Sequence, residues 1–262
     1  MIHSIDPAAC TGCGTCTKTC PLDVFRLEPA QEALSPCMAA CPAGVDIRGN
    51  HYLIQQGHLG EAARRYRSVQ PFPAITGRVC FHPCEKKCAR NHVDEAVNIN
   101  AVEQIMGDWD LKAPLEKPAR RHITKVAVIG SGPAGLSCAW FLAQMGYPVT
   151  VFEAMPLPGG MLRYGIPAYR LPDAIVAAHI ARLEAMGIAF RCNTKIGEGA
   201  DLSLSDLKRL GFKAVMLAPG TTVSRKVRME GVELPGVHWG LEFLRANRGD
   251  EQPRLSGDVL VI

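Results

Sequence analysis

The sequence predicts a multidomain protein in which a small all-α domain precedes an α/β domain of the Rossmann-like type. Two observations predict this order. Nine of the eleven cysteines lie within residues 10–88 among helical segments, and a strand–glycine turn–helix–strand unit follows at residues 125–153. A length of 262 residues allows about two domains. The hydrophobic content of 47% is ordinary for a globular protein and can fill a sizeable core.

The α/β domain begins with an apolar, β-rich strand predicted over residues 126–129. Residues 130–135 follow as Gly-Ser-Gly-Pro-Ala-Gly, which is the spacing G-x-G-x-x-G. Gly130 allows a tight turn, and Gly132 leaves the backbone open to a pyrophosphate. Gly135 lets the next helix pack closely on the strand. This order of elements predicts a dinucleotide site.

The helix after the turn and an acidic residue complete the unit. Pro133 suits the first helical turn, where its missing N–H is not needed, and the helix is predicted from Ala134 onward. Its N-terminus offers free N–H groups to phosphate. A second strand over residues 149–152 ends at Glu153, which lies 18 residues past Gly135 and can accept hydrogen bonds from ribose hydroxyls. A plain glycine turn and a membrane helix are the alternatives, and glycine and proline breaks argue against the helix.

Residues 1–28 carry an iron–sulfur pattern. The run C-x2-C-x2-C-x3-C-P of bacterial ferredoxins occurs without a mismatch. It predicts a [4Fe–4S] cluster rather than zinc, which usually uses two separated C-x2-C pairs. The predicted ligands are Cys10, Cys13, Cys16 and Cys20.

Residues 29–110 are predicted to form the all-α domain. Apolar residues at helical spacing predict helices over residues 45–56, 59–69 and 97–109. Residues 111–124 contain Pro114, Pro118 and clustered charge, which predicts a linker. Five further cysteines in this domain are candidate metal ligands: Cys37, Cys41, Cys80, Cys84 and Cys88.

The rest of the α/β domain, to residue 257, continues the same alternation. A Gly- and Pro-rich loop is predicted over residues 157–172, and the last residues, 258–262, are predicted to begin a further strand. The elements expected between them are a helix over 173–186, a strand over 188–192, a helix over 204–210 and a strand over 214–217.

Charge and targeting signals exclude several classes of protein. A net charge of +4 is too small to indicate nucleic-acid binding. The N-terminus lacks a basic segment followed by an apolar run, so no signal peptide is expected. We therefore expect no membrane span and a cytoplasmic location, where cysteines serve metal binding more often than disulfides.

Several motifs in this order resemble one family. They are GRVC-x2-PC-x3-C at residues 77–88, the G-x-G-x-x-G turn and PGGMLRYGIP-x-YRLP at residues 158–172. Together they resemble the small (β) subunit of NADPH-dependent glutamate synthase and its relatives. These relatives include the N-terminal region of dihydropyrimidine dehydrogenase and the large subunit of bifurcating ferredoxin:NADP oxidoreductase. The N-terminal half-ferredoxin motif is an addition to this pattern.

The resemblance implies an α-helical ferredoxin domain followed by an FAD-binding domain, with NAD(P)H bound by a further domain. Glu153 would hold the adenosine ribose. The residues implied at the FAD site are Gly130, Gly132, Pro133, Ala134, Gly135, Glu153, Gly159, Gly160 and Gly220. Gly220 ends an Ala-Pro-Gly segment where the family usually has A-T-G.

The resemblance also implies how the cysteines divide between clusters. One cluster would use Cys41, Cys80 and Cys84 with Glu103 as a fourth ligand. A second would include Cys37 and Cys88, but the C-x2-C pair that normally precedes Cys37 is missing. Nine cysteines and one glutamate complete two clusters in this chain, or three if a partner supplies ligands. Which cysteines complete the second cluster stays open.

The function implied is an oxidoreductase subunit that moves electrons between NAD(P)H, FAD and [4Fe–4S] clusters. A catalytic or ferredoxin-type redox partner subunit would receive or supply them, and no catalytic acid–base or nucleophilic residue is identified. Because no second glycine motif follows SGDVLVI, the chain is expected to be truncated. The alternatives are a cluster and flavin relay without turnover, and a zinc domain fused to an NAD-binding fold.

Overall fold

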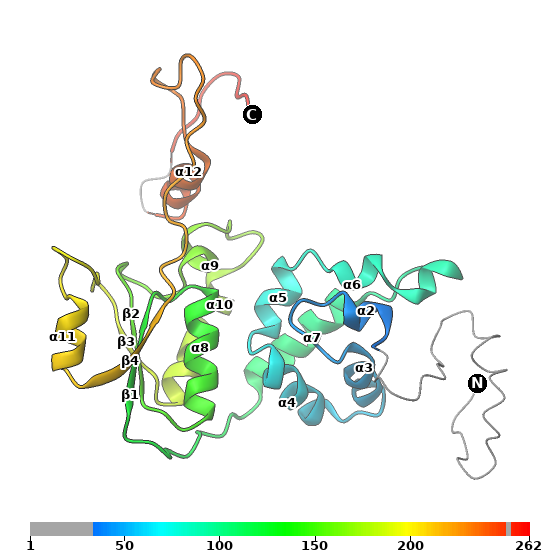
Figure 1. The fold of residues 1–262 in the computed structure, drawn as a ribbon. Helices are drawn as coiled ribbons and strands as arrows, with labels where there is room; N and C mark the ends of the chain where they lie inside the picture. The colour runs from blue at the N-terminus through cyan, green and yellow to red at the C-terminus, as the bar shows by residue number, and fades with distance from the viewer. Residues whose placement is uncertain (1–33, 250–252) are drawn as a thin grey trace, which may run out of the picture. The chain divides into compact units, whose positions relative to one another are not determined.

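The computed structural model describes residues 34–249 and 253–262, so the cysteine run at residues 10–20 lies outside the described residues. The chain divides into two compact units, Met1–Asp110 and Leu111–Ile262 (Figure 1).

All regular structure in the described part of the first unit is helical. The predicted long helices are present: α4 matches its predicted bounds, and the ends of α3 and α7 differ from theirs by one to three residues. Shorter helices also occur, and α2, α5 and α6 each begin at a proline, whose fixed φ suits the first helical turn. The elements are α2 (Pro36–Ala39), α3 (Ile47–Gln55), α4 (Leu59–Val69), α5 (Pro73–Val79), α6 (Pro83–Lys86), the 3-10 helix η1 (Ala89–His92) and α7 (Ile99–Lys112).

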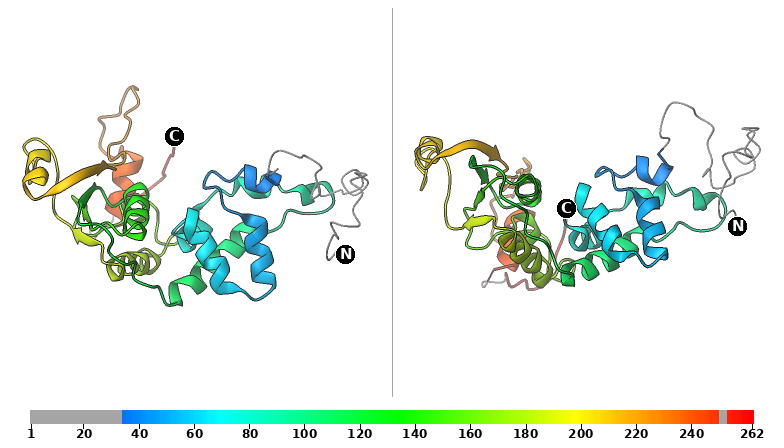
Figure 2. Two further views of the ribbon diagram at one scale, coloured as in Figure 1. Left: turned by 60° about the horizontal axis from the view of Figure 1, so that its bottom comes forward. Right: turned by 90° about the horizontal axis from the view of Figure 1, so that it is seen from below.

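The core of this unit lies between α3, α4 and α7. Helices α3 and α4 pack side by side (Figure 2). The side chain of Asp46 caps α3 by accepting a hydrogen bond from the Gly49 N–H at 2.9 Å. The buried cluster contains one cysteine among its apolar members, which are Val45, Ile47, Leu53, Ala62, Ala63, Tyr66, Cys84, Ile99 and Met106.

Helix α7 contacts α4 and α5 through ion pairs and through a close backbone crossing. Arg67 of α4 pairs with Asp110, which is almost completely buried. Arg78 of α5 donates two hydrogen bonds to Asp108, at 2.7 and 2.8 Å. A Cβ atom on Gly107 would lie 2.1 Å from the Ala74 backbone nitrogen, so the crossing of α5 and α7 requires glycine.

The second unit contains a four-stranded parallel sheet in the order β3-β2-β1-β4. A parallel sheet with helices between its strands agrees with the α/β domain that the sequence predicts. Its strands are β1 (Lys125–Ile129), β2 (Val149–Phe152), β3 (Ala189–Arg191) and β4 (Phe212–Leu217). Its helices are α8 (Pro133–Gln144), α9 (Met161–Tyr164), α10 (Asp173–Ala185), α11 (Leu204–Arg209) and α12 (Gly240–Asn247).

Helices cover the two faces of this sheet (Figure 1). On one face, Val128 lies beside Gly135 of α8. On the other, Ala127 packs with Leu207 of α11 in a small buried cluster. Strand β4 lies at the edge of the described sheet and pairs with β1 alone among the described strands. Its residues 215–217 are 40–60% exposed.

Some elements differ from the sequence predictions. The strand expected at residues 258–262 is wrong, because the structure gives these residues no secondary structure. Residues 259–262 are 59–95% exposed, and a strand needs a paired neighbour to satisfy its backbone groups. Helices α9 and α12 were not expected, and α9 interrupts the predicted loop at residues 157–172. Within the described residues, no helix is both long and apolar enough to cross a membrane.

We expect Gly107→Ala to destabilise the first unit, because the new methyl group would overlap the Ala74 backbone. Overpacking of this kind costs about 1–3 kcal/mol. Gly60→Ala on α4 is the matched control, because its Cβ would meet only Arg64 Nη1 at 3.8 Å. That variant should gain about 0.5–1 kcal/mol of helix stability. Urea unfolding followed by circular dichroism measures both values, and equal effects of the two variants would contradict the close crossing.

Candidate functional site

The glycine turn of the second unit is built from backbone in close approach. Gly130 has φ +98°, and a Cβ atom there would lie 2.2 Å from the Ala218 carbonyl oxygen. A Cβ atom on Gly135 would lie 2.0 Å from the Gly130 carbonyl oxygen. Both positions therefore require glycine, one for the turn and one for the packing of α8 on β1.

Gly132, in contrast, faces open space. A Cβ atom built on Gly132 meets no atom within 4 Å. Pro133 and Ala134, which begin α8, are exposed beside it. The open space at the N-terminus of a 12-residue helix leaves room for a phosphate group that its free N–H groups and dipole would attract.

The Gly159–Gly160 pair lies against this turn. Both glycines have positive φ values, +135° and +53°, which other residues rarely adopt. A Cβ atom on Gly160 would lie 2.7 Å from the Cα atom of Gly132. The structure therefore brings together two segments that the sequence analysis assigned to one cofactor.

Glu153 is held by hydrogen bonds from three backbone or side-chain groups. Its buried carboxylate accepts from the Ser131 N–H at 3.0 Å, from the Ser131 hydroxyl and from the Met155 N–H at 2.9 Å. The Ser131 oxygen also accepts a hydrogen bond from the Gly159 N–H at 2.9 Å. Ser131 was not predicted as a site residue, because the turn motif leaves its identity free.

The end of β4 completes this edge of the sheet. The Ala218 N–H donates to the Ile129 carbonyl at 2.8 Å, which places the segment Ala-Pro-Gly beside the glycine turn. Gly220 is exposed, with φ +67°. The predicted positions 130–135, 153, 159–160 and 220 thus lie along the carboxyl ends of β1, β2 and β4, where open α/β sheets bind ligands.

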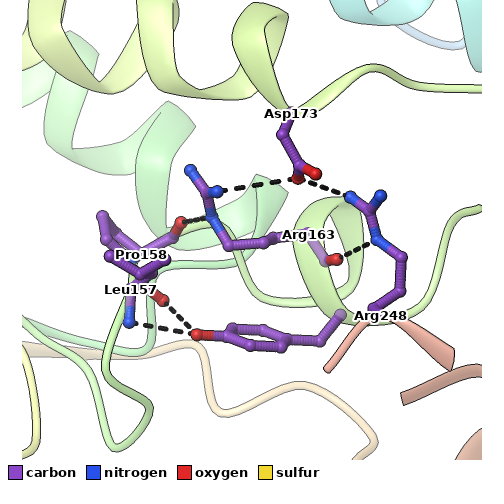
Figure 3. A network of polar contacts seen from close by, with 6 residues as sticks. Leu157, Pro158, Arg163, Asp173 and Arg248 are labelled. Atoms are coloured by element: carbon purple, nitrogen blue, oxygen red, sulfur yellow. Dashed lines mark hydrogen bonds and ion pairs between the residues drawn. The ribbon is translucent and has the colours of Figure 1, made fainter. Parts of the chain in front are cut away.

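Two arginines and one aspartate fix the loop that carries Gly159 (Figure 3). Arg163 donates to the Pro158 carbonyl at 2.9 Å and lies 3.6 Å from the Asp173 carboxylate. Arg248, which follows α12, donates to the same carboxylate and to the Arg163 carbonyl, both at 2.6 Å. We call Arg163, Asp173 and Arg248 the arginine clasp. It joins the Gly159 loop, α10 and the end of α12.

The first unit gathers the candidate cluster ligands around α2 and α6. These two helices pack together and carry Cys37 and Cys84. The pKa of Cys84 is raised to about 11, mainly by burial and also by the nearby charges of Glu85, Cys41 and Cys80, while a backbone hydrogen bond at Glu85 lowers it in part. The thiol is protonated at neutral pH without a metal, so metal binding there would release a proton. The His82 N–H donates to the Cys80 sulfur at 3.3 Å.

Glu103 of α7 is partly buried and hydrogen-bonded. Its Oε1 atom accepts from Gln70 Nε2 at 2.9 Å and from the Thr76 hydroxyl. Burial raises the pKa of Glu103, and these two hydrogen bonds lower it in part. Glu103 also lies close enough to Tyr66 to influence its hydroxyl electrostatically, as do Cys84 and Cys41. The predicted ligands Cys41, Cys84 and Glu103 thus all lie within electrostatic range of one buried tyrosine.

The donor set Cys41, Cys80, Cys84 and Glu103 has the chemistry of an iron–sulfur site, because thiolates are the usual cluster ligands. Within residues 34–249 and 253–262, no three His, Cys, Asp or Glu side chains form a group that could hold one metal ion. The same region holds buried polar atoms of Asn50 and Tyr66 without partners in the described structure, as expected beside a polar group.

The second unit contains two cysteines, and neither is in a disulfide. Cys138 and Cys192 are free and partly buried, and burial raises the pKa of both thiols. Reactive thiols have lowered pKa values. Small apolar packing, as predicted, remains our interpretation of both residues.

Both units of the chain match models of known protein families. A family model described as pyridine nucleotide-disulphide oxidoreductase matches residues 124–262, which is more than half of the chain. The chain belongs to this family. A model described as dihydropyrimidine dehydrogenase domain II, 4Fe-4S cluster, matches residues 31–114. A 4Fe-4S binding domain matches residues 3–26, which contain the ferredoxin-like cysteine run.

Curated relatives agree with this assignment. The chain is 40% identical over 236 residues to the NADPH-Fe(3+) oxidoreductase subunit beta of Geobacter sulfurreducens, covering 86% of this chain and 34% of the relative. It is 35% identical over 254 residues to the NADP(+)-dependent formate dehydrogenase subunit beta of Moorella thermoacetica, covering 87% and 36%. It is 36% identical over 240 residues to the glutamate synthase [NADPH] small chain of Bacillus subtilis, covering 84% and 48%.

The chain therefore spans about a third to a half of the length of these relatives. The resemblance to the glutamate synthase small-subunit group is confirmed, as is the order of an iron–sulfur domain before a pyridine nucleotide oxidoreductase domain. The relatives are named as oxidoreductases, dehydrogenases or synthases, and two of these three names include a subunit designation.

Ser131→Ala should destabilise the second unit by about 1–3 kcal/mol, because it leaves the buried Gly159 N–H without its acceptor and removes a donor to Glu153. Ser205→Ala, at an exposed position of α11, is the control and should change stability by less than about 0.5 kcal/mol. Urea unfolding measures both. Equal stability of the Ser131 variant and the unchanged protein would show that the network contributes nothing.

Arg248→Ala should free the end of α12 from the Gly159 loop. We expect amide hydrogen exchange in residues 240–247 to accelerate by about tenfold. This factor is near the lower end of the stabilisation that charge-assisted hydrogen bonds provide, because Asp173 is half exposed and solvent weakens its interaction with Arg248. Arg245→Ala removes a neighbouring arginine whose hydrogen bond, to the Thr222 carbonyl, is exposed. That control should exchange as the unchanged protein does. Equal acceleration in both variants would contradict a specific role for the arginine clasp.

Proposed function

We propose that the chain is an electron-transferring subunit of an FAD and iron–sulfur oxidoreductase that exchanges electrons between NAD(P)H and a partner. The observation that supports this proposal best is the glycine turn, where Gly132 faces open space beside the buried Glu153. The other unit of the same chain matches 4Fe-4S families. Flavin exchanges electron pairs with nicotinamide and single electrons with clusters, which gives a chemical reason for joining the two units.

FAD is proposed at the carboxyl edge of the sheet. The N–H groups that begin α8 and the open side of Gly132 would bind the pyrophosphate. Glu153, already ordered by Ser131, would accept hydrogen bonds from the adenosine ribose. Gly159, Gly160 and Gly220 would approach the cofactor through backbone alone. No redox-active C-x-x-C or C-x4-C pair occurs in residues 124–262, so flavin is the proposed electron carrier of this unit.

Clusters are proposed in the first unit. Cys41, Cys80 and Cys84, with Glu103, are the proposed ligands of one cluster, which the mutual electrostatic influence of the three thiols supports. Cys37 and Cys88 are proposed for another. The remaining ligands of this second cluster would come from the run of Cys10, Cys13, Cys16 and Cys20. In the alternative, that run would hold a separate cluster, and a partner would supply the ligands that are then missing.

A redox partner subunit is part of the proposal. Relatives named as subunits or chains of larger enzymes support it, and the terminal reaction would belong to that partner. No catalytic acid–base or nucleophilic residue is proposed in this chain. NAD(P)H is the proposed source or acceptor of electron pairs in the full-length protein.

Anaerobic purification tests the proposal directly. Iron, acid-labile sulfide and FAD should all copurify, with broad absorbance near 400 nm from clusters and separate flavin bands that dithionite bleaches. A colourless preparation that contains zinc would overturn the redox assignment and support a zinc domain fused to a nucleotide-binding fold.

Gly132→Glu should abolish FAD binding while leaving iron content unchanged. A Cβ atom at this position meets no neighbour within 4 Å, so we expect the loss to come from blocking the pyrophosphate rather than from misfolding. Gly211→Glu offers a control, because that glycine also faces open space but lies away from the cofactor edge, at the start of β4. Its strained φ of +90° can lower stability, so FAD is measured per folded protein. Normal FAD content in the Gly132 variant would refute the site.

A further inference from the structure

The first unit contains two buried polar side chains that its described structure leaves without hydrogen bonds. Asn50 of α3 is completely buried, and Tyr66 of α4 is 1% exposed. Neither polar atom of the Asn50 amide nor the Tyr66 hydroxyl has a hydrogen-bond partner among the described residues. Buried polar groups are nearly always hydrogen-bonded, so a group at such a position indicates a missing partner.

These two side chains lie together. Hydrogen bonding by the Asn50 amide lowers the pKa of the Tyr66 hydroxyl in part, although the two groups do not meet at normal hydrogen-bond geometry within the described structure. Their helices, α3 and α4, pack against each other in the core of the unit (Figure 2). The two polar groups therefore form one polar spot inside an otherwise apolar cluster.

The polar spot is next to the candidate cluster ligands. Burial raises the pKa of the Tyr66 hydroxyl, and the charges of Glu103, Cys84 and Cys41 raise it further. Cys84 belongs to the same buried cluster as Tyr66, and Cys41 packs against that cluster. The Tyr66 hydroxyl thus lies within electrostatic reach of three of the four residues proposed to hold one cluster.

We propose that Tyr66 and Asn50 donate hydrogen bonds to the sulfur atoms of the cluster held by Cys41, Cys80 and Cys84, and that they raise its reduction potential. The inference rests on the proposed function, since it requires the cluster to be bound. It assigns a role to two residues that are not ligands.

The physical basis is the charge of the reduced cluster. One added electron increases the negative charge on the sulfurs, and an O–H or N–H donor stabilises this charge more than it stabilises the oxidised cluster. Hydrogen bonds to sulfur and exclusion of solvent are among the factors that set the potentials of iron–sulfur clusters. Because both donors are buried, water does not compete with them or screen them.

A buried water molecule is the competing occupant. It could satisfy the Asn50 amide and the Tyr66 hydroxyl together, since a buried water typically makes about three hydrogen bonds. The two explanations differ in their consequences. A water-filled spot would leave the reduction potential insensitive to the hydroxyl.

Tyr66→Phe and Asn50→Leu test the proposal, because each removes the polar group and nearly preserves the volume. Each variant should bind as much iron and sulfide as the unchanged chain. In redox titrations followed by EPR, one cluster should become harder to reduce, with its ratio of reduced to oxidised form about tenfold lower at a fixed potential. For a one-electron couple this is a shift of about 59 mV to lower potential.

Tyr52→Phe is the matched control, because its hydroxyl belongs to a side chain that is 62% exposed on the same helix as Asn50. It should leave every potential unchanged. A second signature is the shift of iron–sulfur stretching frequencies in resonance Raman spectra between H2O and D2O. This isotope shift should diminish in Tyr66→Phe and persist in Tyr52→Phe.

The outcomes distinguish a failure of this inference from a failure of the proposed function. Unchanged potentials and isotope shifts in iron-loaded Tyr66→Phe and Asn50→Leu would overturn the inference and leave the proposed function intact. Loss of iron from both variants would also overturn it, because the residues would then serve assembly rather than tuning. If one variant does not fold, the other decides. An unchanged chain that binds no iron would overturn the proposed function, and the inference with it.

Discussion

The hydrogen bonds of the Glu153 carboxylate are the interaction on which the second unit depends. They join the end of β2 to the glycine turn through Ser131, and Ser131 in turn holds the Gly159 N–H. The glycine turn, the end of β2 and the Gly159 loop thereby share one buried polar centre. At the proposed FAD site, a carboxylate that is already ordered would lose little conformational freedom on accepting a ribose, so this part of the site would be organised before its ligand arrives.

In the first unit, short helices hold the candidate cysteine ligands. Helices α2 and α6 are only four residues long and each carries a candidate cysteine ligand. Helices of this length are not stable alone, so the core around α3 and α4 must support them. That core leaves Asn50 and Tyr66 unpartnered within the described structure, a cost that a bound polar group would remove.

The sequence predicted the elements that depend on local pattern. The long helices, the parallel strands and the close approaches of Gly130 and Gly135 follow from periodicity and from glycine spacing. Helix α12 and the arginine clasp could not be predicted, because the Arg248–Asp173 pair joins residues 75 positions apart. Ser131 was missed because no spacing rule specifies it. The strand expected at residues 258–262 failed because apolar composition alone does not supply a pairing neighbour.

The edge position of β4 has a consequence for the behaviour of the chain in solution. Residues 215–217 are substantially exposed, and β1 is the only described strand that pairs with β4. An open strand edge with apolar side chains can add a strand from any chain that approaches in register. Self-association through this edge should therefore increase with concentration, and a covering segment or a charged substitution there would keep the protein monodisperse.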